Sequence, residues 1–377
     1  MSVEIVATES ALEGAVARAQ DFPAVSLDTE SDSFYRYPER LCLAQLAAGD
    51  RVWLIDTLSI RRLDSLQRLL ENPHVGKIFH AAEYDVAVLR RRCPSLTKVA
   101  NLFDTMAAAR ILGWNDLGLS AILETRFSVR LDKDMQRSNW GLRPLTKAQI
   151  HYAAEDVRYL AALSELQARE LKERERWEHA REAFEALAYS EIAITEFNPE
   201  GFRSLKGAAD LDGSGLARLR ALYLLREQEA RARHLPPFKV LTNALMVDLA
   251  GAAPSTRSQL KTIRGVSPYI FGNYGVKILK ALERARAGPA VGPGPFSRRE
   301  LSRDQVRLYG KLKDWRKAVA QTQGVAPDVI VSNDALKKIA KAGPGSVDAL
   351  AALEVIGPWK LKEYGESLVA AVRCELP

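Results

Sequence analysis

Acidic side chains recur at three places in the first half of this 377-residue chain, each at a spacing that could serve chemistry. The three places are the pair Asp28 and Glu30, the single residue Asp85, and the pair Tyr152 and Asp156. Adjacent carboxylates repel one another unless a cation or a proton lies between them. Mg²⁺ and Mn²⁺ prefer oxygen ligands, so the first pair is a candidate site for a divalent metal.

Secondary structure decides where these side chains can point. Asp28 and Glu30 lie at the end of a strand predicted over residues 24–28, and side chains two apart on a strand share a face. Asp85 is in the first turn of a helix predicted over residues 83–91, where it could face the carboxyl edge of a sheet. Each acid also has an ordinary explanation, because acidic residues are common at strand ends and are favoured by the helix dipole in a first turn.

The third place lies on a long helix that is predicted to begin at Thr146 and to run into the charged stretch 172–185. Its start, Thr-Lys-Ala-Gln, has the form of a capping box. Tyr152 and Asp156 are four residues apart and are therefore neighbours on one helical face. They flank the apolar stripe of this helix, at the edge where a helix borders a cleft. The alternative is a surface tyrosine beside a solvated aspartate.

The surrounding segments predict an α/β body with a mixed sheet. Strands are expected over residues 24–28, 41–47, 51–55, 75–79 and 99–103, and helices over residues 63–70 and 83–91 and from residue 105 onward. The segment Ala48-Gly49-Asp50 is typical of a hairpin turn between two of these strands. Three antiparallel strands followed by alternating helices and strands favour this fold class.

The second half of the chain contains an internal repeat with a period of 90 residues. Matching pairs include Leu222 and Leu312, Arg226 and Arg316, Asn243 and Asn333, Tyr274 and Tyr364, and Gly275 and Gly365. Between the two copies, residues 287–295 are rich in glycine and proline and are predicted to be a linker. The chain is therefore expected to consist of a body followed by two small helical modules.

Composition excludes several classes of protein. Hydrophobic residues make up 47% and charged residues 27% of the chain, which excludes collagen-like and largely disordered proteins. Residues 1–200 hold 25 Lys and Arg against 31 Asp and Glu, whereas residues 201–377 hold 29 against 16. The front therefore carries a net charge of −6 and the back +13. A basic tail of this kind suggests an anionic polymer as partner, although a solvated basic surface is the other interpretation.

The remaining composition indicates a cytoplasmic protein. No apolar run reaches the roughly 18 to 20 residues that cross a bilayer, and the N-terminal residues do not resemble a signal peptide. Cys42, Cys93 and Cys374 are scattered and odd in number, which fits neither a disulfide framework nor a zinc site. We expect all three to be reduced thiols.

Taken together and in this order, the three acidic places resemble the three motifs of the DEDD superfamily of 3′–5′ exonucleases, in the variant with a tyrosine. Further segments look like bacterial ribonuclease D, namely Lys77–Asp85, Phe103–Thr105, Leu131–Trp140 and Arg143–Leu145. The repeated modules resemble the HRDC domain. The resemblance implies a ribonuclease H-like exonuclease domain over residues 1–195 and HRDC-like domains over 205–287 and 300–377, with a linker over 288–299.

The resemblance also implies a site and its cofactors. Two divalent cations, Mg²⁺ or Mn²⁺, are expected, and no organic cofactor. Asp28 would bridge both ions, Glu30 and Asp156 would complete the site of the ion that activates water, and Asp85 would support the second. Tyr152 would orient the attacking water. Contacts with the substrate are expected of four further residues, His80, Lys133, Trp140 and Arg143.

The implied reaction is removal of nucleoside 5′-monophosphates from 3′ ends of precursor tRNA and other small structured RNAs, by a monomer that does not bind membranes. The HRDC-like modules would hold the RNA. Two alternatives stay open at this point. The same fold could degrade DNA from its 3′ end, or the protein could bind nucleic acid without catalysis. The presence of four acids and one tyrosine at the motif positions argues against the second alternative.

Overall fold

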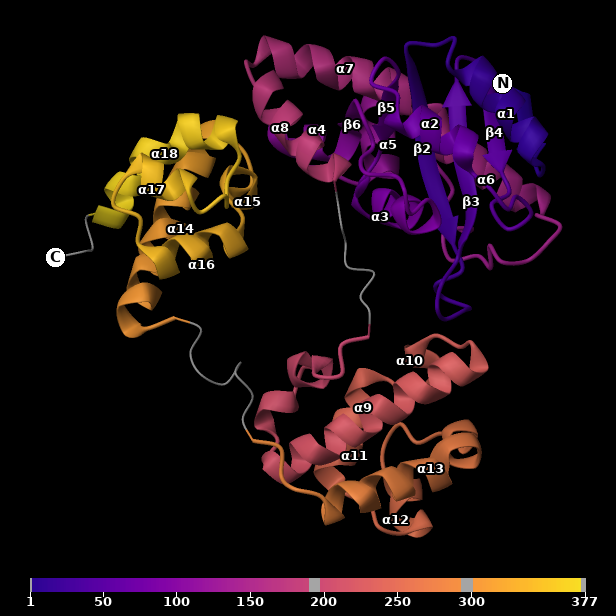
Figure 1. Cartoon of the computed structure of the whole chain (residues 1–377), viewed down its shortest axis with the longest axis vertical. Coiled ribbons are helices and arrows are strands. Elements are labelled where there is room, and N and C mark those ends of the chain that lie inside the picture. The colour runs from indigo at the N-terminus through magenta and orange to yellow at the C-terminus, as the bar shows by residue number, and fades with distance from the viewer. Residues whose placement is uncertain (1, 190–196, 293–300, 374–377) are drawn as a thin grey trace. The chain divides into compact units, whose positions relative to one another are not determined.

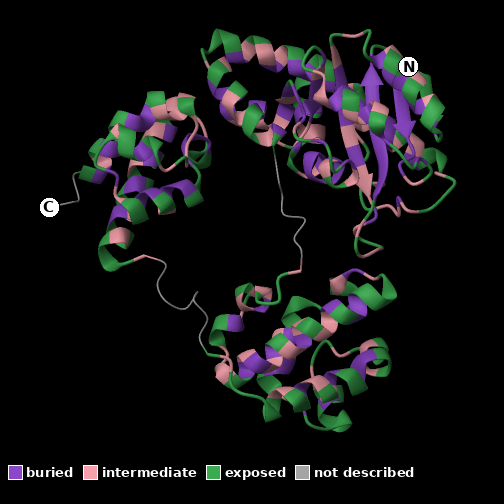
Figure 2. Ribbon diagram, in the orientation of Figure 1, coloured by how far each residue is buried: buried purple, intermediate pink, exposed green. Residues whose placement is uncertain are grey.

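A computed structural model describes residues 2–189, 197–292 and 301–373 of the chain (Figure 1). Two compact units are distinguished. The first comprises Met1–Glu30, Leu41–Ile194 and Leu301–Pro377, and the second comprises Ser31–Arg40 and Thr195–Glu300. Figure 2 shows that buried residues concentrate in the strands and on one side of most helices, as expected for separate hydrophobic cores.

A six-stranded mixed sheet forms the body of the first unit, which confirms the predicted fold class. Its strands are β1 (Ser2–Val6), β2 (Ala24–Ser31), β3 (Leu41–Ala48), β4 (Arg51–Ile55), β5 (Gly76–Phe79) and β6 (Leu102–Asp104). The spatial order is β1-β4-β3-β2-β5-β6. Strands β3 and β4 are antiparallel, whereas β1 runs parallel to β4, and β5 runs parallel to both β2 and β6.

Helices cover both faces of this sheet. They are α1 (Glu9–Ala19), α2 (Asp64–Glu71), α3 (Glu83–Arg92), α4 (Thr105–Leu112), α5 (Leu119–Phe127), α6 (Lys147–Arg158), α7 (Leu160–Glu173) and α8 (Trp177–Ala188). Alternate residues of β4 belong to different core clusters, because successive side chains of a strand point to opposite faces. Trp53 and Ile55 pack with side chains of α1, α2 and α3, and Val52 and Leu54 pack with α6.

The prediction of a single long helix from Thr146 is wrong, because the chain forms three helices there. Helix α6 ends just before Tyr159, α7 begins just after it, and α8 follows after a left-handed residue, Glu175, with a φ of 56°. The predicted start is confirmed, since Thr146 caps α6 in a capping box with Gln149. The break has a packing reason: α6 contacts strands β3 and β4, whereas α7 contacts α4 and β5, so one straight helix could not reach both surfaces.

The internal repeat is confirmed by two sets of helices. The first set is α9 (Gly213–Arg233), α10 (Pro237–Val240), α11 (Asn243–Ala252), α12 (Arg257–Thr262) and α13 (Pro268–Ala287). The second set is α14 (Arg303–Gln323), α15 (Pro327–Ile330), α16 (Asn333–Ala342), α17 (Val347–Ala351) and α18 (Pro358–Arg373). Corresponding helices begin 90 residues apart. Two short 3₁₀ helices, Gly201–Ser204 and Ala208–Asp210, precede the first set.

A shared hydrogen-bond network shows that the two copies are built alike. Arg226 donates to the side-chain oxygen of Asn243 at 2.6 Å, and Arg316 donates to that of Asn333 at 2.8 Å. Each guanidinium also donates to the carbonyl two residues before its asparagine. The periodic residues of the sequence are therefore structural, since they join the first long helix of each copy to the start of its third helix.

Three further predictions concern membrane-spanning helices, the cysteines and the linker. Within residues 2–189, 197–292 and 301–373, none of the helices combines the length and apolarity needed to span a bilayer. Cys42 and Cys93 are buried and form no disulfide within the described part of the chain, whereas Cys374 lies outside the described residues, as do residues 293–299 of the predicted linker.

Candidate active site

Three carboxylates meet at one point of the α/β body of the first unit. Asp28 and Glu30 lie on β2, and Asp156 lies on α6, where each is partly exposed. One oxygen from each lies within 4.8 Å of the other two, which makes them a group that could hold a metal ion. Glu30 and Asp156 are far apart in the sequence, and the packing of α6 against the sheet brings them together.

Asp85 lies beside this group and is more deeply buried, at 6% exposure. It lies in the first turn of α3, and its carboxylate accepts a hydrogen bond from the hydroxyl of Thr29. Its charge raises the pKa of Asp28, which reflects how near the two carboxylates are. The structure therefore brings the four predicted acids together, with Asp85 held from the strand that carries the first two.

The surroundings of these acids disfavour their charged forms. Burial and, to a lesser extent, the neighbouring carboxylates raise the pKa of Asp28 and raise the pKa of Glu30 to about 9. Burial also raises the pKa of Asp85 to about 7 and the pKa of Asp156 to about 6, against the hydrogen bonds from Thr29 and Tyr152 that lower them. Such a set of repelling acids is what a divalent cation would stabilise.

Tyr152 lies next to these acids on α6, one turn before Asp156. Its hydroxyl is hydrogen bonded to Asp156, and burial together with the carboxylates raises the pKa of the phenol well above its ordinary value. The hydroxyl therefore stays protonated at neutral pH and serves as a hydrogen-bond donor.

A cleft of about 280 Å³ opens over this site. Its lining includes Asp28, Tyr152 and Asp156, together with His80 and the exposed Lys133. The structure thus brings two of the four expected substrate contacts to the cleft. Burial lowers the pKa of His80 to about 4, so this imidazole is neutral at physiological pH.

The expectation that Trp140 contacts the substrate requires correction. Its side chain is 1% exposed and belongs to the core cluster between the sheet and α6. The indole ring lies 6.0 Å from the ring of Tyr152, centroid to centroid. Because it has no exposed face, Trp140 supports the ring of Tyr152 from within the core and is not accessible to a substrate.

The side chain of Arg143 also has a structural role. Its guanidinium forms a two-pronged ion pair with Asp56, at 2.6 and 2.8 Å. It also donates to the carbonyls of Cys42, Trp140 and Leu142. All three guanidinium nitrogens are therefore engaged, and they fasten the loop that carries Arg143 to β3. The expectation that Arg143 contacts the substrate is thus wrong, because no nitrogen is left to bind phosphate.

Sequence reasoning missed the residues that hold the motif residues in place. These are Thr29, between the two acids of β2, and Asp104 and Thr105, at the junction of β6 and α4. Their motifs, Asp-Thr-Glu and Phe-Asp-Thr, were visible, but the distant partner of each side chain was not.

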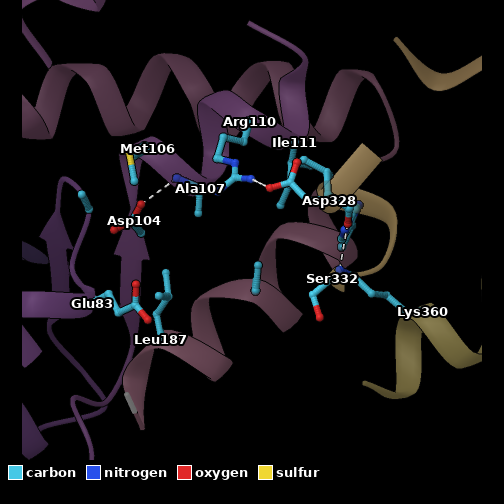
Figure 3. A pocket seen from close by; sticks show the side chains of 14 residues that line it. Glu83, Asp104, Met106, Ala107, Arg110, Ile111, Leu187, Asp328, Ser332 and Lys360 are labelled. Atoms are coloured by element: carbon cyan, nitrogen blue, oxygen red, sulfur yellow. Dashed lines mark hydrogen bonds and ion pairs between the residues drawn. The ribbon is translucent and has the colours of Figure 1, made fainter. Parts of the chain in front are cut away.

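A second pocket, of about 330 Å³, lies between α4, α8 and the second helical module within the first unit (Figure 3). Its charged groups are largely engaged, since Arg110 pairs with Asp328 and the Lys360 ammonium donates to the carbonyl of Val329 at 2.8 Å. Asp104 lines it and caps α4. None of the four motif acids lines this pocket, so it is separate from the acidic cleft.

Comparison with known proteins agrees with this site. A family model described as 3′-5′ exonuclease matches residues 3–171, and the HRDC domain model matches residues 215–282 and 305–372.

Curated relatives match almost the whole chain. Ribonuclease D of Gluconacetobacter diazotrophicus is 31% identical over 370 residues, which cover 97% of this chain and 92% of the relative. Ribonuclease D of Pseudomonas paraeruginosa is 32% identical over 360 residues, with 93% and 92% covered.

Solved structures agree in fold. The crystal structure of Escherichia coli RNase D, an exoribonuclease involved in structured RNA processing, aligns over the full length of both chains with a TM-score of 0.74 and 24% identity. A protein from Bifidobacterium adolescentis aligns over 98% of this chain and 97% of its own, with a TM-score of 0.80 and 20% identity. The acidic cleft, the two HRDC domains and the full-length similarity lead to one conclusion: the chain belongs to the ribonuclease D family of 3′–5′ exoribonucleases.

Proposed function

We propose that this protein trims the 3′ ends of precursor tRNA and other small structured RNAs, and that it releases nucleoside 5′-monophosphates with the help of two divalent cations. The observation that carries the proposal is the cluster of Asp28, Glu30 and Asp156, whose oxygens lie within 4.8 Å of one another, with Asp28 and Asp156 lining an open cleft. The RNA preference is supported by the family alone.

The donor set fits Mg²⁺ or Mn²⁺. All ligand atoms are carboxylate oxygens. Burial and, to a lesser extent, mutual repulsion raise the pKa of Asp28 and of Glu30, which a bound cation would reverse. Asp28 would serve both cations, Glu30 and Asp156 would complete the first site, and Asp85 would support the second. When bound, the cations lower the pKa of a water molecule and neutralise the charge that develops on the leaving 3′ oxygen.

The residues of the chain supply orientation. The protonated hydroxyl of Tyr152 is suited to holding the attacking water, and the buried ring of Trp140 limits how far the tyrosine can move. Lys133 and His80 line the same cleft and would contact the terminal nucleotide. Because hydrolysis depends on alignment of water with phosphorus, each of these contacts would contribute through positioning.

The two HRDC-like domains, proposed over residues 205–287 and 300–377, would hold the body of the RNA. Residues 201–377 carry a net charge of +13, and phosphate neutralisation provides affinity that does not depend on sequence. The exonuclease domain, proposed over residues 1–195, holds 25 Lys and Arg against 29 Asp and Glu, a net charge of −4, and would gain most from such a tether. We further propose that the protein works as a monomer in the cytoplasm.

The direct test compares the wild type with the Asp28→Asn variant on a 3′-extended tRNA and on a DNA of matched sequence. Each reaction is run with Mg²⁺, with Mn²⁺ and with a chelator, and products are separated by size and by thin-layer chromatography. We expect metal-dependent shortening of the RNA from its 3′ end by the wild type alone, with 5′-monophosphates as products. The Glu83→Gln variant is a matched control, because this exposed carboxylate lies on α3 outside the cleft.

The other outcomes select other functions. Shortening of DNA alone would identify a DNA exonuclease. Tight binding of nucleic acid without shortening, under either metal, would identify a binding protein without catalysis.

A further inference from the structure

Asp104 occupies a position between two helices. It is the last residue of β6, it is 1% exposed, and it pairs in register with Phe79 at the end of β5. One carboxylate oxygen accepts the N–H of Ala107 at 2.6 Å, which makes Asp104 the N-cap of α4 (Figure 3). The other oxygen accepts the N–H of Ala82, also at 2.6 Å. That second bond reaches the start of a different helix, α3.

Helix α3 has no side-chain cap of its own. Its N-cap residue is Ala82, and the preceding residue, Ala81, is left-handed with a φ of 63°, a conformation that alanine adopts rarely. The first N–H groups of a helix have no partner within the helix and need acceptors from elsewhere. Asp104 supplies one of these acceptors from the neighbouring strand. Asp85 lies three residues after Ala82, within the first turn of the helix whose start is held in this way.

Thr105 holds the same turn from its other end. Its hydroxyl donates to the carbonyl of Phe79 at 3.1 Å and lies 2.8 Å from Nδ1 of His80. The carbonyl of Thr105 is itself held by the amide of Gln167 at 2.8 Å. The turn between β5 and α3 is therefore held at both ends by two consecutive residues that lie outside the three acidic places of the sequence.

We propose that Asp104 is a positioning residue for the cation site: its carboxylate, shared between α4 and α3, sets the orientation of the first turn of α3 and so presents Asp85 to the other acids. This inference rests on the proposed role of Asp85 as a ligand. It requires a carboxylate, because two N–H groups are accepted by two different oxygens. An amide offers one accepting oxygen and cannot serve both helices.

The Asp104→Asn substitution separates this role from ordinary capping. Asparagine and aspartate are about equally good N-caps, so a residue that only capped α4 would tolerate the change. Asp212 supplies the matched control, because it caps α9 through a single bond to the N–H of Gly215 at 2.6 Å. We expect Asp212→Asn to behave as the wild type.

Three measurements on the full-length chain test the positioning role of Asp104. In Asp104→Asn we expect kcat for RNA to fall about 10- to 100-fold with KM for RNA unchanged, as for other groups that orient metal ligands. Raising the Mg²⁺ concentration should recover part of the loss. Titration of Mn²⁺ into the RNA-free protein, followed by calorimetry, should show a weakened or missing second site. Because metal would also stabilise a partly unfolded protein, the folded content of Asp104→Asn is checked by circular dichroism before each assay.

Other results would overturn the inference. Wild-type kcat and wild-type Mn²⁺ binding in Asp104→Asn would do so. If the wild type itself fails to shorten RNA while the variant still loses a Mn²⁺ site, the proposed function fails and the positioning role stands. Should Asp104→Asn not fold, hydrogen exchange of the wild type decides, because the amide of Ala82 should exchange slowly and fast exchange would refute the bond.

Discussion

The hydroxyl of Thr29 donates a hydrogen bond to the carboxylate of Asp85, so the strand that carries two of the acids also holds a third. Both groups are buried, and removal of the donor would leave the carboxylate without this partner in a poorly hydrated place. This arrangement follows from the geometry of β2, because successive side chains of a strand point to opposite faces of the sheet. Asp28 and Glu30 point to one side of the strand, and Thr29, between them, points to the other.

We therefore expect Thr29→Val, which keeps the shape of the side chain and removes the hydroxyl, to lower kcat about 10- to 100-fold. Thr29→Ser keeps the donor and should stay within a few fold of the wild type. Single-turnover hydrolysis of a 3′-extended tRNA measures both. Equal losses in the two variants would point to packing of the threonine methyl group instead of its hydroxyl.

Metal-free protein should be destabilised by its own acids. Because burial and mutual repulsion disfavour the charged forms of Asp28 and its neighbours, Asp28→Asn should raise the Tm in chelator by about 2 to 8 °C. Mg²⁺ should raise the Tm of the wild type and have a much smaller effect on the variant. Differential scanning calorimetry with and without metal provides the comparison. A variant that is less stable in chelator and still responds fully to Mg²⁺ would contradict the assignment.

Tyr152→Phe should lower kcat about 10- to 100-fold while KM for RNA and Mn²⁺ affinity stay near wild type, because the hydroxyl orients and does not ligate. Tyr159→Phe is the matched control, since Tyr159 lies at the end of the same helix and does not line the cleft. Steady-state kinetics and calorimetric titration of Mn²⁺ check both halves of this expectation. Loss of Mn²⁺ binding in Tyr152→Phe would mean that the tyrosine maintains the acids themselves.

The ion pair between Arg143 and Asp56 should contribute stability that depends on pH. Burial would raise the pKa of Asp56, but hydrogen bonds from Arg143 and Ser59 bring it below its ordinary value. A lowered pKa in the folded state means that the contribution is present above the unfolded pKa of about 4 and is lost as the pH falls through the folded pKa.

Asp56→Asn should thus cost about 1 to 3 kcal/mol of unfolding free energy at pH 7 and progressively less below pH 4. Urea unfolding of both proteins across this range measures the difference. A cost that does not change with pH would show that Arg143 acts there through packing alone.

The repeated arginine should be structural in both HRDC domains. Arg316 is buried and donates to the Val331 carbonyl and to the Asn333 side chain, so Arg316→Met should destabilise the second domain by about 1 to 3 kcal/mol. Lys317→Met also removes one positive charge, but at the exposed neighbouring position, and should have little effect on the free energy of unfolding. Urea unfolding followed by tryptophan fluorescence includes this domain through Trp315 and Trp359, and comparison of the two variants isolates its contribution from that of the other four tryptophans. If RNA affinity falls equally in both variants, the effect on binding is one of charge.

Much of the molecule could be predicted from local spacing. Spacings of two residues on a strand and four on a helix fix which side chains share a face, and this was enough to select Asp28 with Glu30 and Tyr152 with Asp156. A constant shift of 90 residues was enough to find the two helical domains, because both copies keep the same helix starts. The α/β order of the body followed from alternating short apolar segments, since the period of a segment is a local property.

Only the tertiary structure decided the roles that depend on distant partners. Arg143 pairs with Asp56, 87 residues away, and Thr29 with Asp85, 56 residues away, so neither bond leaves a trace in local pattern. Trp140 could have faced solvent or the core, and the packing of α6 on the sheet chose the core. The break at Tyr159 has the same origin, because the chain turns to cover two different surfaces. The amino-acid sequence by itself determined which residues could do the chemistry, and long-range packing decided which of them are free to do it.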